Sequence, residues 1–413
     1  MLTIKKSDFK KVKDKKPFAK RPYAFIFIKR SDYVFLDGLE DAFEAIGVKG
    51  YGLDLFPWTQ KQEFIARLIA LIVQVNPDFV LTLSHNGVDP EGDLGNLLGD
   101  LDVPLVSWLL DSPGLILSPF RAVVGDNVFL FSTDASALPE LSQLGYKHAF
   151  YLPLGVNAHP RASGDGLAPA AVHAAENRLL FVGETFSAKI GRYIKTTPSL
   201  VRLLPAYKKI AGRLVAERAK TVVALLAEEG GPYAAWYHAL GSAPVRQKFD
   251  LIVSLYANKL YRTAVLARAI AKEHLIVGPL DWKNALKDRS INLMPSNYDR
   301  SFIAGLYKAA TITLNITSVH MHGAANERVF DVPFAGGFLL TDSSDQIAGL
   351  FEVGQEIATY SGADDFVEQY KRYAQDGATR AKYSENARKR IDAEHTYVHR
   401  AATMVSILKA ARA

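Results

Sequence analysis

The chain has 413 residues, 49% of them apolar, and a formal net charge of +6. This length favours two domains over one or three, and the apolar content is sufficient to bury two cores, which excludes a disordered protein. The absence of cysteine excludes disulfides, thiolate chemistry and cysteine-ligated metal.

The positive charge is concentrated at the start of the chain. Residues 1–21 contain nine Lys or Arg and two Asp, a net charge of +7, which leaves 40 basic and 41 acidic residues, or −1, in the rest. We expect residues 1–21 to form a disordered, solvated arm and not a nucleic-acid-binding surface, because a block of like charges repels itself. Contact of this arm with an acidic acceptor or an anionic membrane surface stays open.

The first apolar segment, residues 23–28, is a strand candidate and not a secretion signal. Lys29 and Arg30 end it, so that it is too short for the apolar core of a signal peptide. No segment reaches the roughly 18 to 20 uninterrupted apolar residues of a membrane-spanning helix. We therefore expect a cytoplasmic protein.

Residues 22–155 alternate short apolar strands with helical periods. The expected strands lie at 23–28, 78–84, 104–110, 128–133 and 148–155, with helices over 36–46 and 64–77. Strands that are apolar on both faces and separated by helices are typical of a parallel sheet covered by helices. The pattern predicts a Rossmann-like domain, followed by a linker over 156–177 that is rich in Gly, Pro and Ala.

Residues 178–393 are predicted to form a second Rossmann-like domain, with strands at 178–184, 274–278, 311–317 and 337–342. Between 198 and 272 the pattern is almost wholly helical, and this block is too long for one crossover between strands. The expected fold class is therefore α/β, with two Rossmann-like domains facing a cleft and a helical insertion in the second. In such open sheets, ligands bind beyond the carboxyl ends of the strands.

One candidate ligand site follows the strand at 178–184. Gly183 and Glu184 come first, and Lys189 and Arg192 lie within a helix that should begin near residue 187. A glycine lets a ligand approach the backbone, and the N–H groups of a helix start attract phosphate. The GxGxxG fingerprint and the GxxxxGK[ST] loop are both absent. The alternative is a plain strand-to-helix turn with solvent-facing basic residues.

A second candidate site lies within HMHGAANERVFDVPFAGGFLLTD, residues 320–342. A helix over 325–336 would place Arg328 and Asp331 on one face. There an arginine can hold a diphosphate in bidentate fashion, while a carboxylate accepts two sugar hydroxyls. The alternative is a surface ion pair of little energy. Pro333 predicts a kink or an early end of this helix.

In the first domain, polar residues follow two expected strands, as SHNG (84–87) and DSP (111–113). Such runs suit an acceptor site. The alternative is that His85 caps a turn and Asp111 caps a helix.

Several motifs together carry a resemblance to a known family. NERVFDVPFAGGFLLTD (326–342), LFEVGQEIATY (350–360) and EHTYVHRAATMV (394–405) look like the C-terminal half of the CgeB-like glycosyltransferases, which are related to group 1 glycosyltransferases of GT-B fold. SHNGVD and PLVSWLLDSP resemble the N-terminal domain often paired with that half, and YLPLGVN (151–157) is similar to the linker motif between GT-B domains. The resemblance covers most of the chain and is thin over 198–270.

The resemblance implies that a nucleoside diphosphate sugar binds mainly to the C-terminal domain and an acceptor to the N-terminal one. Residues 394–413 would form a terminal helix that crosses back to the N-terminal domain. Trp282 would stack on the nucleobase or pack in the structure. The candidate donor-binding residues are Gly183, Glu184, Lys189, Arg192, Trp282, Asn326, Arg328 and Asp331.

The chain departs from the group 1 pattern at one position. That pattern has two glutamates separated by seven residues, the second of which holds the donor ribose. Asp331 takes the second place, and Gly323 stands at the first. The contact of the missing acid with the donor sugar must then come from elsewhere, such as residues 320–322, and a retaining mechanism cannot be assumed.

The expected function is glycosyl transfer of hexosyltransferase type to an unknown glycan, protein or small-molecule acceptor, without a cofactor. Arg328, Lys189 or Arg192 and a helix start would stabilise the departing diphosphate. If the reaction inverts configuration, Asp111 or His85 could deprotonate the acceptor hydroxyl. His320 and His322 have no obvious third ligand, so no metal site is predicted. The alternatives are a sugar-nucleotide epimerase, a non-catalytic sugar- or nucleotide-binding protein, and an inactive scaffold.

Overall fold

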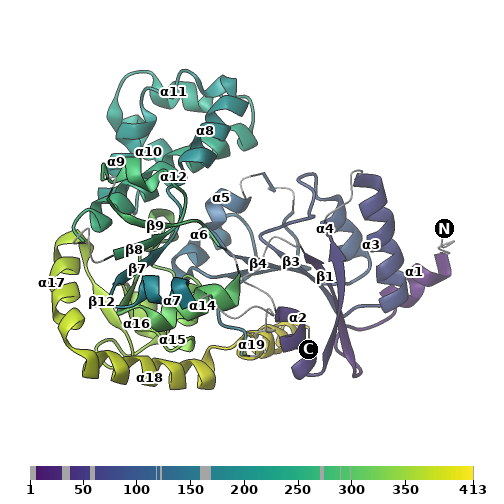
Figure 1. Ribbon diagram of the computed structural model, residues 1–413. Coiled ribbons are helices and arrows are strands. Elements are labelled where there is room, and N and C mark those ends of the chain that lie inside the picture. Colours follow the sequence, from purple (N-terminus) through teal and green to yellow (C-terminus); the bar gives the residue numbers. More distant parts are fainter. Residues whose placement is uncertain are drawn as a thin grey trace. The chain divides into compact units, whose positions relative to one another are not determined.

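The computed structural model describes residues 6–29, 38–55, 61–117, 119–120, 123–158, 169–269, 274–288, 290–297 and 299–412. The chain forms two compact units, one of residues 1–161 and 394–413 and the other of residues 162–393. Each unit contains one parallel sheet of six strands with helices (Figure 1). The predicted α/β class with two Rossmann-like domains is thus confirmed.

The sheet of the first unit has the strand order β2-β1-β3-β4-β5-β6. Every residue of β3, β4 and β5 is buried, as expected for parallel strands covered by helices on both faces. The strands are β1 (Tyr23–Lys29), β2 (Val48–Asp54), β3 (Phe79–Leu83), β4 (Leu105–Leu109), β5 (Val128–Ser132) and β6 (His148–Tyr151). The helices are α1 (Lys6–Lys13), α2 (Leu39–Ala45), α3 (Lys61–Val75), α4 (Asp93–Asp100), α5 (Pro113–Leu117), α6 (Leu138–Gln143) and α19 (Tyr397–Ala410).

Residues 6–21 differ from the disordered arm that their charge predicts. They contain α1, and the side chain of Phe18 is buried. The Phe18 N–H donates a hydrogen bond to the buried Asp78 carboxylate at 2.8 Å, and Lys15 forms an ion pair with the same group at 3.0 Å. Apolar residues between the lysines anchor the segment, so the prediction of disorder is wrong for its described part. The residues before Lys6 lie outside the described ones.

Residues 394–413 belong to the first unit. Helix α19 packs against α2, and Thr396 forms an isolated β-bridge with Val156. The buried guanidinium of Arg400 donates from Nε to the Leu154 carbonyl at 2.9 Å. The chain therefore returns to its first unit after the second one is finished.

The sheet of the second unit has the strand order β12-β11-β10-β7-β8-β9. Its strands are β7 (Leu179–Val182), β8 (His274–Val277), β9 (Asn292–Met294), β10 (Ile312–Asn315), β11 (Leu339–Asp342) and β12 (Ala358–Tyr360). Its helices outside the helical block are α7 (Pro169–Ala175), α8 (Ser187–Thr196), α13 (Trp282–Ala285), α14 (Arg300–Ala309), α15 (Arg328–Phe334), α16 (Asp345–Leu350), α17 (Gly362–Gln375) and α18 (Gly377–Glu394). Helix α7 falls inside the range predicted as a linker, of which residues 159–168 lie outside the described part.

The helical block of the second unit consists of α9 (Tyr207–Ala216), α10 (Val222–Glu229), α11 (Tyr233–His238) and α12 (Ala243–Leu266). In Figure 1, α9, α10 and α11 gather at one end of this unit, and α12 runs from them toward the strands. Phe249 and Ile252 of α12 belong to the same buried cluster as Phe181 of β7 and Ile276 of β8. The block therefore shares the hydrophobic core of the sheet.

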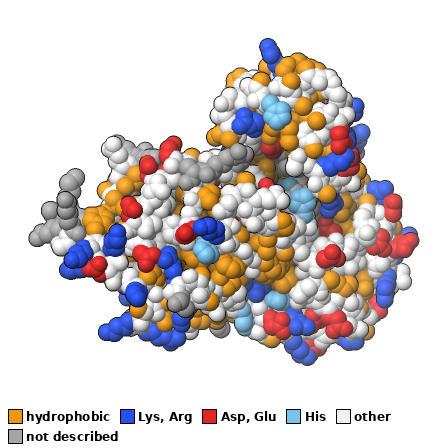
Figure 2. Space-filling view, turned by 180° about the vertical axis from the view of Figure 1, so that it is seen from behind, with side chains coloured by type: hydrophobic (Ala, Val, Ile, Leu, Met, Phe, Trp, Pro, Cys, Tyr) orange, Lys and Arg blue, Asp and Glu red, His pale blue; other side chains and the backbone are white. Residues whose placement is uncertain are grey.

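The surface carries charges of both signs, and the helices are those of a globular protein. Acidic and basic side chains are interspersed over the face shown in Figure 2. Among the described residues, no helix is both long and apolar enough to cross a membrane. The same part of the chain holds no group of three or more His, Asp or Glu placed to bind a metal ion.

Candidate functional site

The turn after β7 is fixed by its contacts with the core. A Cβ atom on Gly183 would lie 2.8 Å from the ring of Phe181, so this position has no room for a side chain without rearrangement. The Gly183 carbonyl accepts a hydrogen bond from the indole N–H of Trp282 at 2.9 Å. A Cβ atom on Gly278 would lie 2.4 Å from the same carbonyl oxygen. The backbone of this turn is therefore held in one place.

Trp282 was predicted to stack on a nucleobase or to pack in the structure. Its side chain is completely buried, and its ring meets that of Phe181 edge-on, with 5.7 Å between the centroids. A ring without an exposed face cannot stack on a ligand, so the stacking prediction is wrong. Trp282 instead supports the turn at Gly183.

Helix α8 begins directly after this turn without a side-chain cap. The residue before it, Phe186, adopts the left-handed conformation with φ of 62°. The Ser187 N–H makes only a long hydrogen bond to Thr185 Oγ1, at 3.3 Å. Lys189 and Arg192 follow on α8, and both are exposed. The start of α8 can thus offer backbone N–H groups and the positive end of the helix dipole to an anion.

Asn326 joins α15 to the sheet. Its Nδ2 donates to Oδ1 of Asn315, which is buried at the end of β10, at 2.9 Å. Its Oδ1 accepts from the Arg328 N–H at 3.1 Å and so satisfies a backbone group at the start of α15. The Asn315 amide in turn donates to Thr341 Oγ1 of β11 at 2.9 Å. The sequence predicts that Asn326 contacts the donor. In the structure, its hydrogen bonds link the start of α15 to the end of β10.

Arg328 and Asp331 both lie at the carboxyl edge of the sheet, but each has a different ionic neighbour. Arg328 Nη1 lies 3.1 Å from the Glu327 carboxylate, and Arg300 of α14 lies 3.5 Å from Asp331. Nε of Arg328 is buried and has no hydrogen-bond partner among the described residues. Burial raises the pKa of Asp331 to about 7, against the opposing effect of Arg300.

Helix α15 is shorter than the predicted helix over 325–336. It ends at Phe334, one residue after Pro333, and the predicted early end is therefore observed. Gly336 follows with φ of 84°, and Gly337 donates to the Val332 carbonyl at 2.9 Å. A Cβ atom on Gly337 would lie 2.3 Å from the Tyr307 carbonyl. The glycine pair is thus required for both the helix end and the entry into β11.

Gly323 occupies the position where the group 1 pattern has its first glutamate. The residue has φ of 95°, which side chains rarely adopt. Its carbonyl accepts a hydrogen bond from Ser344 Oγ at 2.6 Å. His322 before it is exposed, whereas His320 is partly buried. The local backbone therefore favours glycine here on conformational grounds.

Arg262 of α12 was missed by the sequence interpretation. Its side chain lies within the second unit and donates from Nη1 to the Glu184 carbonyl at 2.8 Å. Only 6% of the residue is exposed. Burial lowers the pKa of Arg262 to about 10, with the like charge of Arg328 acting in the same direction and the carboxylates of Glu327, Asp342 and Glu184 in the opposite one. The residue lies in a long stretch of helical sequence with many basic side chains, so no pattern distinguishes it.

In the first unit, His85 and Asp111 follow adjacent strands but differ in exposure. His85 is 1% exposed, and burial lowers the pKa of His85 to about 3. Its Nδ1 lies 2.8 Å from Ser107 Oγ, and its Nε2 has no hydrogen-bond partner among the described residues. Asp111 is exposed and accepts a hydrogen bond from the Ser112 N–H at 2.9 Å. A buried imidazole of such low pKa is a weak base at neutral pH, which leaves Asp111 as the better candidate.

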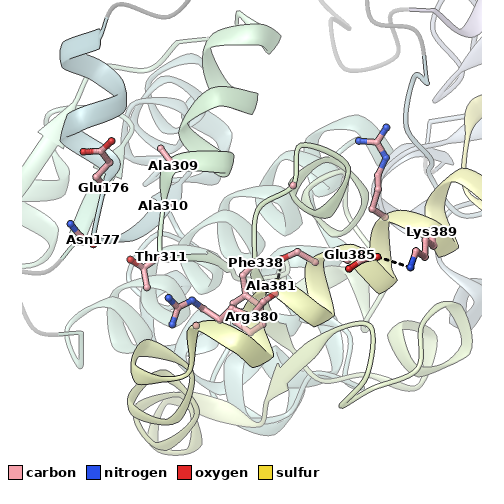
Figure 3. Close-up of a pocket in the computed structure, with 14 residues that line it drawn as sticks. Glu176, Asn177, Ala309, Ala310, Thr311, Phe338, Arg380, Ala381, Glu385 and Lys389 are labelled. Carbon is pink, nitrogen blue, oxygen red and sulfur yellow. Dashed lines mark hydrogen bonds and ion pairs between the residues drawn. The ribbon is translucent and has the colours of Figure 1, made fainter.

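A groove of about 800 Å³ lies elsewhere in the second unit (Figure 3). Asn177, Thr311 and Phe338 line it and lie one or two residues before β7, β10 and β11, so it lies at the amino ends of the strands. Its charged residues have partners within the protein: Lys389 forms an ion pair with Glu385 at 2.6 Å, and Arg380 donates to the Ala374 carbonyl at 2.9 Å. Ligands of open α/β sheets bind at the other edge, and we do not assign the donor to this groove.

Comparison with known proteins points to glycosyltransferases. A family model described as "Glycosyl transferase-like" matches residues 262–406. No match was found among curated proteins. The matched segment begins at the end of α12 and includes the whole region from β8 to α18.

Solved structures share the fold over nearly the whole chain. HepE from Anabaena, in complex with UDP-glucose, is 9% identical over 94% of this chain and 99% of its own, with a TM-score of 0.56. The sucrose-phosphate synthase from Thermosynechococcus elongatus is 11% identical over 94% of this chain and 98% of its own, with a TM-score of 0.55. A glycosyltransferase from Rickettsia africae is 11% identical over 95% and 99%, with a TM-score of 0.54. The two-domain α/β fold is therefore that of GT-B glycosyltransferases.

Proposed function

We propose that this protein transfers a sugar from a nucleoside diphosphate sugar to an acceptor hydroxyl. The observation that carries the proposal is the pair Arg328 and Asp331, which lies at the carboxyl edge of the second sheet. The pair combines a buried, unpartnered guanidinium nitrogen with a carboxylate. The family match over residues 262–406 and the shared fold support this assignment.

On the donor side, we assign the diphosphate to Arg328 and the ribose to Asp331. A guanidinium makes charge-assisted hydrogen bonds to phosphate oxygens, and an ionised carboxylate accepts hydrogen bonds from two neighbouring hydroxyls. The start of α8 adds a helix dipole, with Lys189 and Arg192 on its exposed surface. As the glycosidic bond to the diphosphate breaks, these cations stabilise the charge on the leaving group. We propose that this stabilisation does not depend on a metal ion.

On the acceptor side, we propose Asp111 as the general base of an inverting transfer. It is exposed and follows a buried strand, in the position where a ligand of an open sheet can reach it. The proton of the acceptor hydroxyl passes to the carboxylate as the hydroxyl oxygen attacks the anomeric carbon. The crystal structures of HepE contain UDP-glucose, or UDP and glucose, which makes a UDP-hexose the first donor to test. We also propose that the protein is related to the CgeB-like glycosyltransferases and that it is cytoplasmic.

The test is a thermal-shift panel of UDP, GDP, ADP and TDP with their sugars, followed by product analysis. A ligand at about 1,000 times its dissociation constant adds roughly 4 kcal/mol to the free energy of unfolding. A transferase releases the nucleoside diphosphate, whereas an epimerase returns a nucleotide sugar. The site assignment requires that Arg328→Ala and Asp331→Asn both weaken nucleotide binding, and unchanged affinity in both variants contradicts it. EDTA should leave the rate of transfer unchanged.

A further inference from the structure

Arg262 is a buried cation, and no carboxylate of the described residues lies within ion-pair distance of it. It forms no ion pair with any described residue, and its Nε is buried without a hydrogen-bond partner. Its Nη1 donates a hydrogen bond to a neutral group, the Glu184 carbonyl, at 2.8 Å. Burial of an unpaired charge is unfavourable. The like charge of Arg328 adds to this cost, and the charges of Glu327, Asp342 and Glu184, which form no ion pair with Arg262, offset part of it. Such an arrangement becomes favourable when an anion binds.

The surroundings of Arg262 indicate where that anion binds. The guanidinium carbon lies 4.7 Å from the ring centroid of Phe186, the residue that precedes the uncapped start of α8. A Cβ atom on Gly183 would lie 3.6 Å from Nη1 of Arg262. The guanidinium therefore lies beside a glycine backbone and close to a helix start, and both features admit phosphate.

Two neighbours of Arg262 on α12 hold the other loops at this edge of the sheet. Asn258 accepts a hydrogen bond from the Val319 N–H at 2.6 Å, in the loop after β10. Lys259 donates to Ser187 Oγ at the first residue of α8, at 2.8 Å. Positions 258, 259 and 262 lie on adjacent parts of the helix surface. One segment of α12 therefore contacts both strand-end loops that border the proposed donor site.

We infer that Arg262 is a donor-binding residue, whose guanidinium binds the diphosphate of the nucleotide together with Arg328. The helical block, through α12, is then part of the donor site and not only a structural addition. The identification of the anion as a diphosphate rests on the proposed function. The presence of an anion site at Arg262 does not depend on that function, because it follows from the buried guanidinium without an ion pair and from the uncapped start of α8 beside it.

The experiment measures binding of inorganic pyrophosphate and of UDP by calorimetry. Arg262→Gln should weaken both by more than tenfold, and Arg262→Lys should weaken them less, because lysine keeps the charge and loses the fork of donors. The matched control is Arg268→Gln, just beyond the end of α12, where the exposed arginine pairs with Asp364 at 2.8 Å. The control should bind both probes within twofold of the wild type.

A third variant separates binding from support of the fold. Arg262→Met removes a buried charge, so the ligand-free protein should be at least as stable as the wild type while it fails to bind pyrophosphate. A residue that only braced the turn would give the opposite result, with lower stability and unchanged affinity per folded molecule. That result, or wild-type affinity in folded Arg262→Gln, overturns the inference.

The same measurements distinguish this inference from the proposed function. Arg262-dependent binding of pyrophosphate without turnover of any nucleotide sugar would sustain the anion site and reject the transferase. Turnover with an unchanged KM in Arg262→Gln would sustain the transferase and reject the role of Arg262. A wild-type protein that binds neither pyrophosphate nor any nucleotide rejects both.

Discussion

A Cβ atom on Gly323 would lie 2.6 Å from Cβ of Ser344, the residue that caps α16. The same glycine has φ of 95°. Position 323, where the group 1 pattern has its first glutamate, is therefore built for glycine in this chain. Steric contact and backbone conformation both oppose any side chain at that position.

Gly323→Ala should lower the free energy of unfolding by about 3 kcal/mol, from the sum of backbone strain and overpacking. The matched control is Gly336→Ala, which has φ of 84° but no atom within 4 Å of the added Cβ, and it should cost only about 1 to 2 kcal/mol. Chemical denaturation of both variants measures the difference. Equal losses in the two variants would show that the Ser344 side chain can move away at little cost. An acidic side chain at position 323 would then be tolerated.

The ionisation of Asp331 should make stability depend on pH. Burial raises its pKa to about 7, with Glu327 acting in the same direction and Arg300 and Arg328 in the opposite one. The unfolded carboxyl loses its proton near pH 4, so the free energy of unfolding should fall as pH rises from about 4 to 7, by at most about 1.4 kcal/mol per pH unit. Asp331→Asn should abolish this contribution in denaturation curves across that range.

Nucleotide affinity should follow the same ionisation. If the Asp331 carboxylate accepts ribose hydroxyls, the affinity of the wild type for UDP should increase with pH up to about 7 and then level off. Asp331→Asn should bind more weakly and lose this pH dependence. Calorimetric titrations between about pH 5.5 and 8.5 test this, and a parallel pH profile in wild type and variant would contradict it.

Trp282 should affect stability far more than ligand contact. Trp282→Phe removes the indole N–H that bonds to Gly183 and leaves a small cavity in the core. We expect a loss of about 2 to 3 kcal/mol in the free energy of unfolding, with nucleotide affinity changed by no more than a few-fold. A large loss of affinity at unchanged stability would restore the stacking role that burial excludes.

His85 should remain neutral in the folded protein down to low pH. Its buried ring has a pKa of about 3, whereas the unfolded side chain takes up a proton near pH 6.5. Stability should therefore be lost as pH falls from about 6.5 toward 3, because the unfolded state binds a proton that the folded state does not. In His85→Gln, the pH dependence of the free energy of unfolding over this range should correspond to up to one proton less. NMR titration of the ring provides a direct check, and a midpoint near 6.5 would show that the site opens to solvent.

Asp111→Asn should lower kcat by a factor of about 100 to 10,000 if the residue is the general base. The KM for the donor should change little, since no part of the donor is assigned to Asp111. His85→Gln serves as the comparison, and its kcat should exceed that of the Asp111 variant. The opposite order would assign the base to the histidine.

The class of fold followed from the sequence because the buried strands are nearly continuous runs of apolar residues. β3, β4 and β5 are buried at every position and were predicted within a few residues. β2 was missed, since VKGYGLD contains two glycines and a lysine and only its Val48 and Leu53 are buried. Sheet edges tolerate such composition, and local pattern then loses its predictive value.

The proposed donor site was predictable only where its residues are close in sequence. Arg328 and Asp331 lie three positions apart and follow a recognisable pattern, whereas Arg262 is brought to Glu184 by the path of α12 across the core. Trp282 was misplaced because an aromatic residue after a strand looks the same in sequence whether it faces a ligand or the core. Lys15 was assigned to a solvated arm because its partner, Asp78, is remote in sequence.

The bridge between Val156 and Thr396 has a consequence for the biogenesis of the protein. Residues 394–413 belong to the first unit, yet they leave the ribosome only after all of the second unit. The second unit can therefore complete its core during synthesis, while the first must wait with α2 uncovered until α19 arrives. The first unit is thus completed after the second. Premature termination just before residue 394 would remove α19 and so leave the first unit incomplete, although the second unit lies next to the missing segment in sequence.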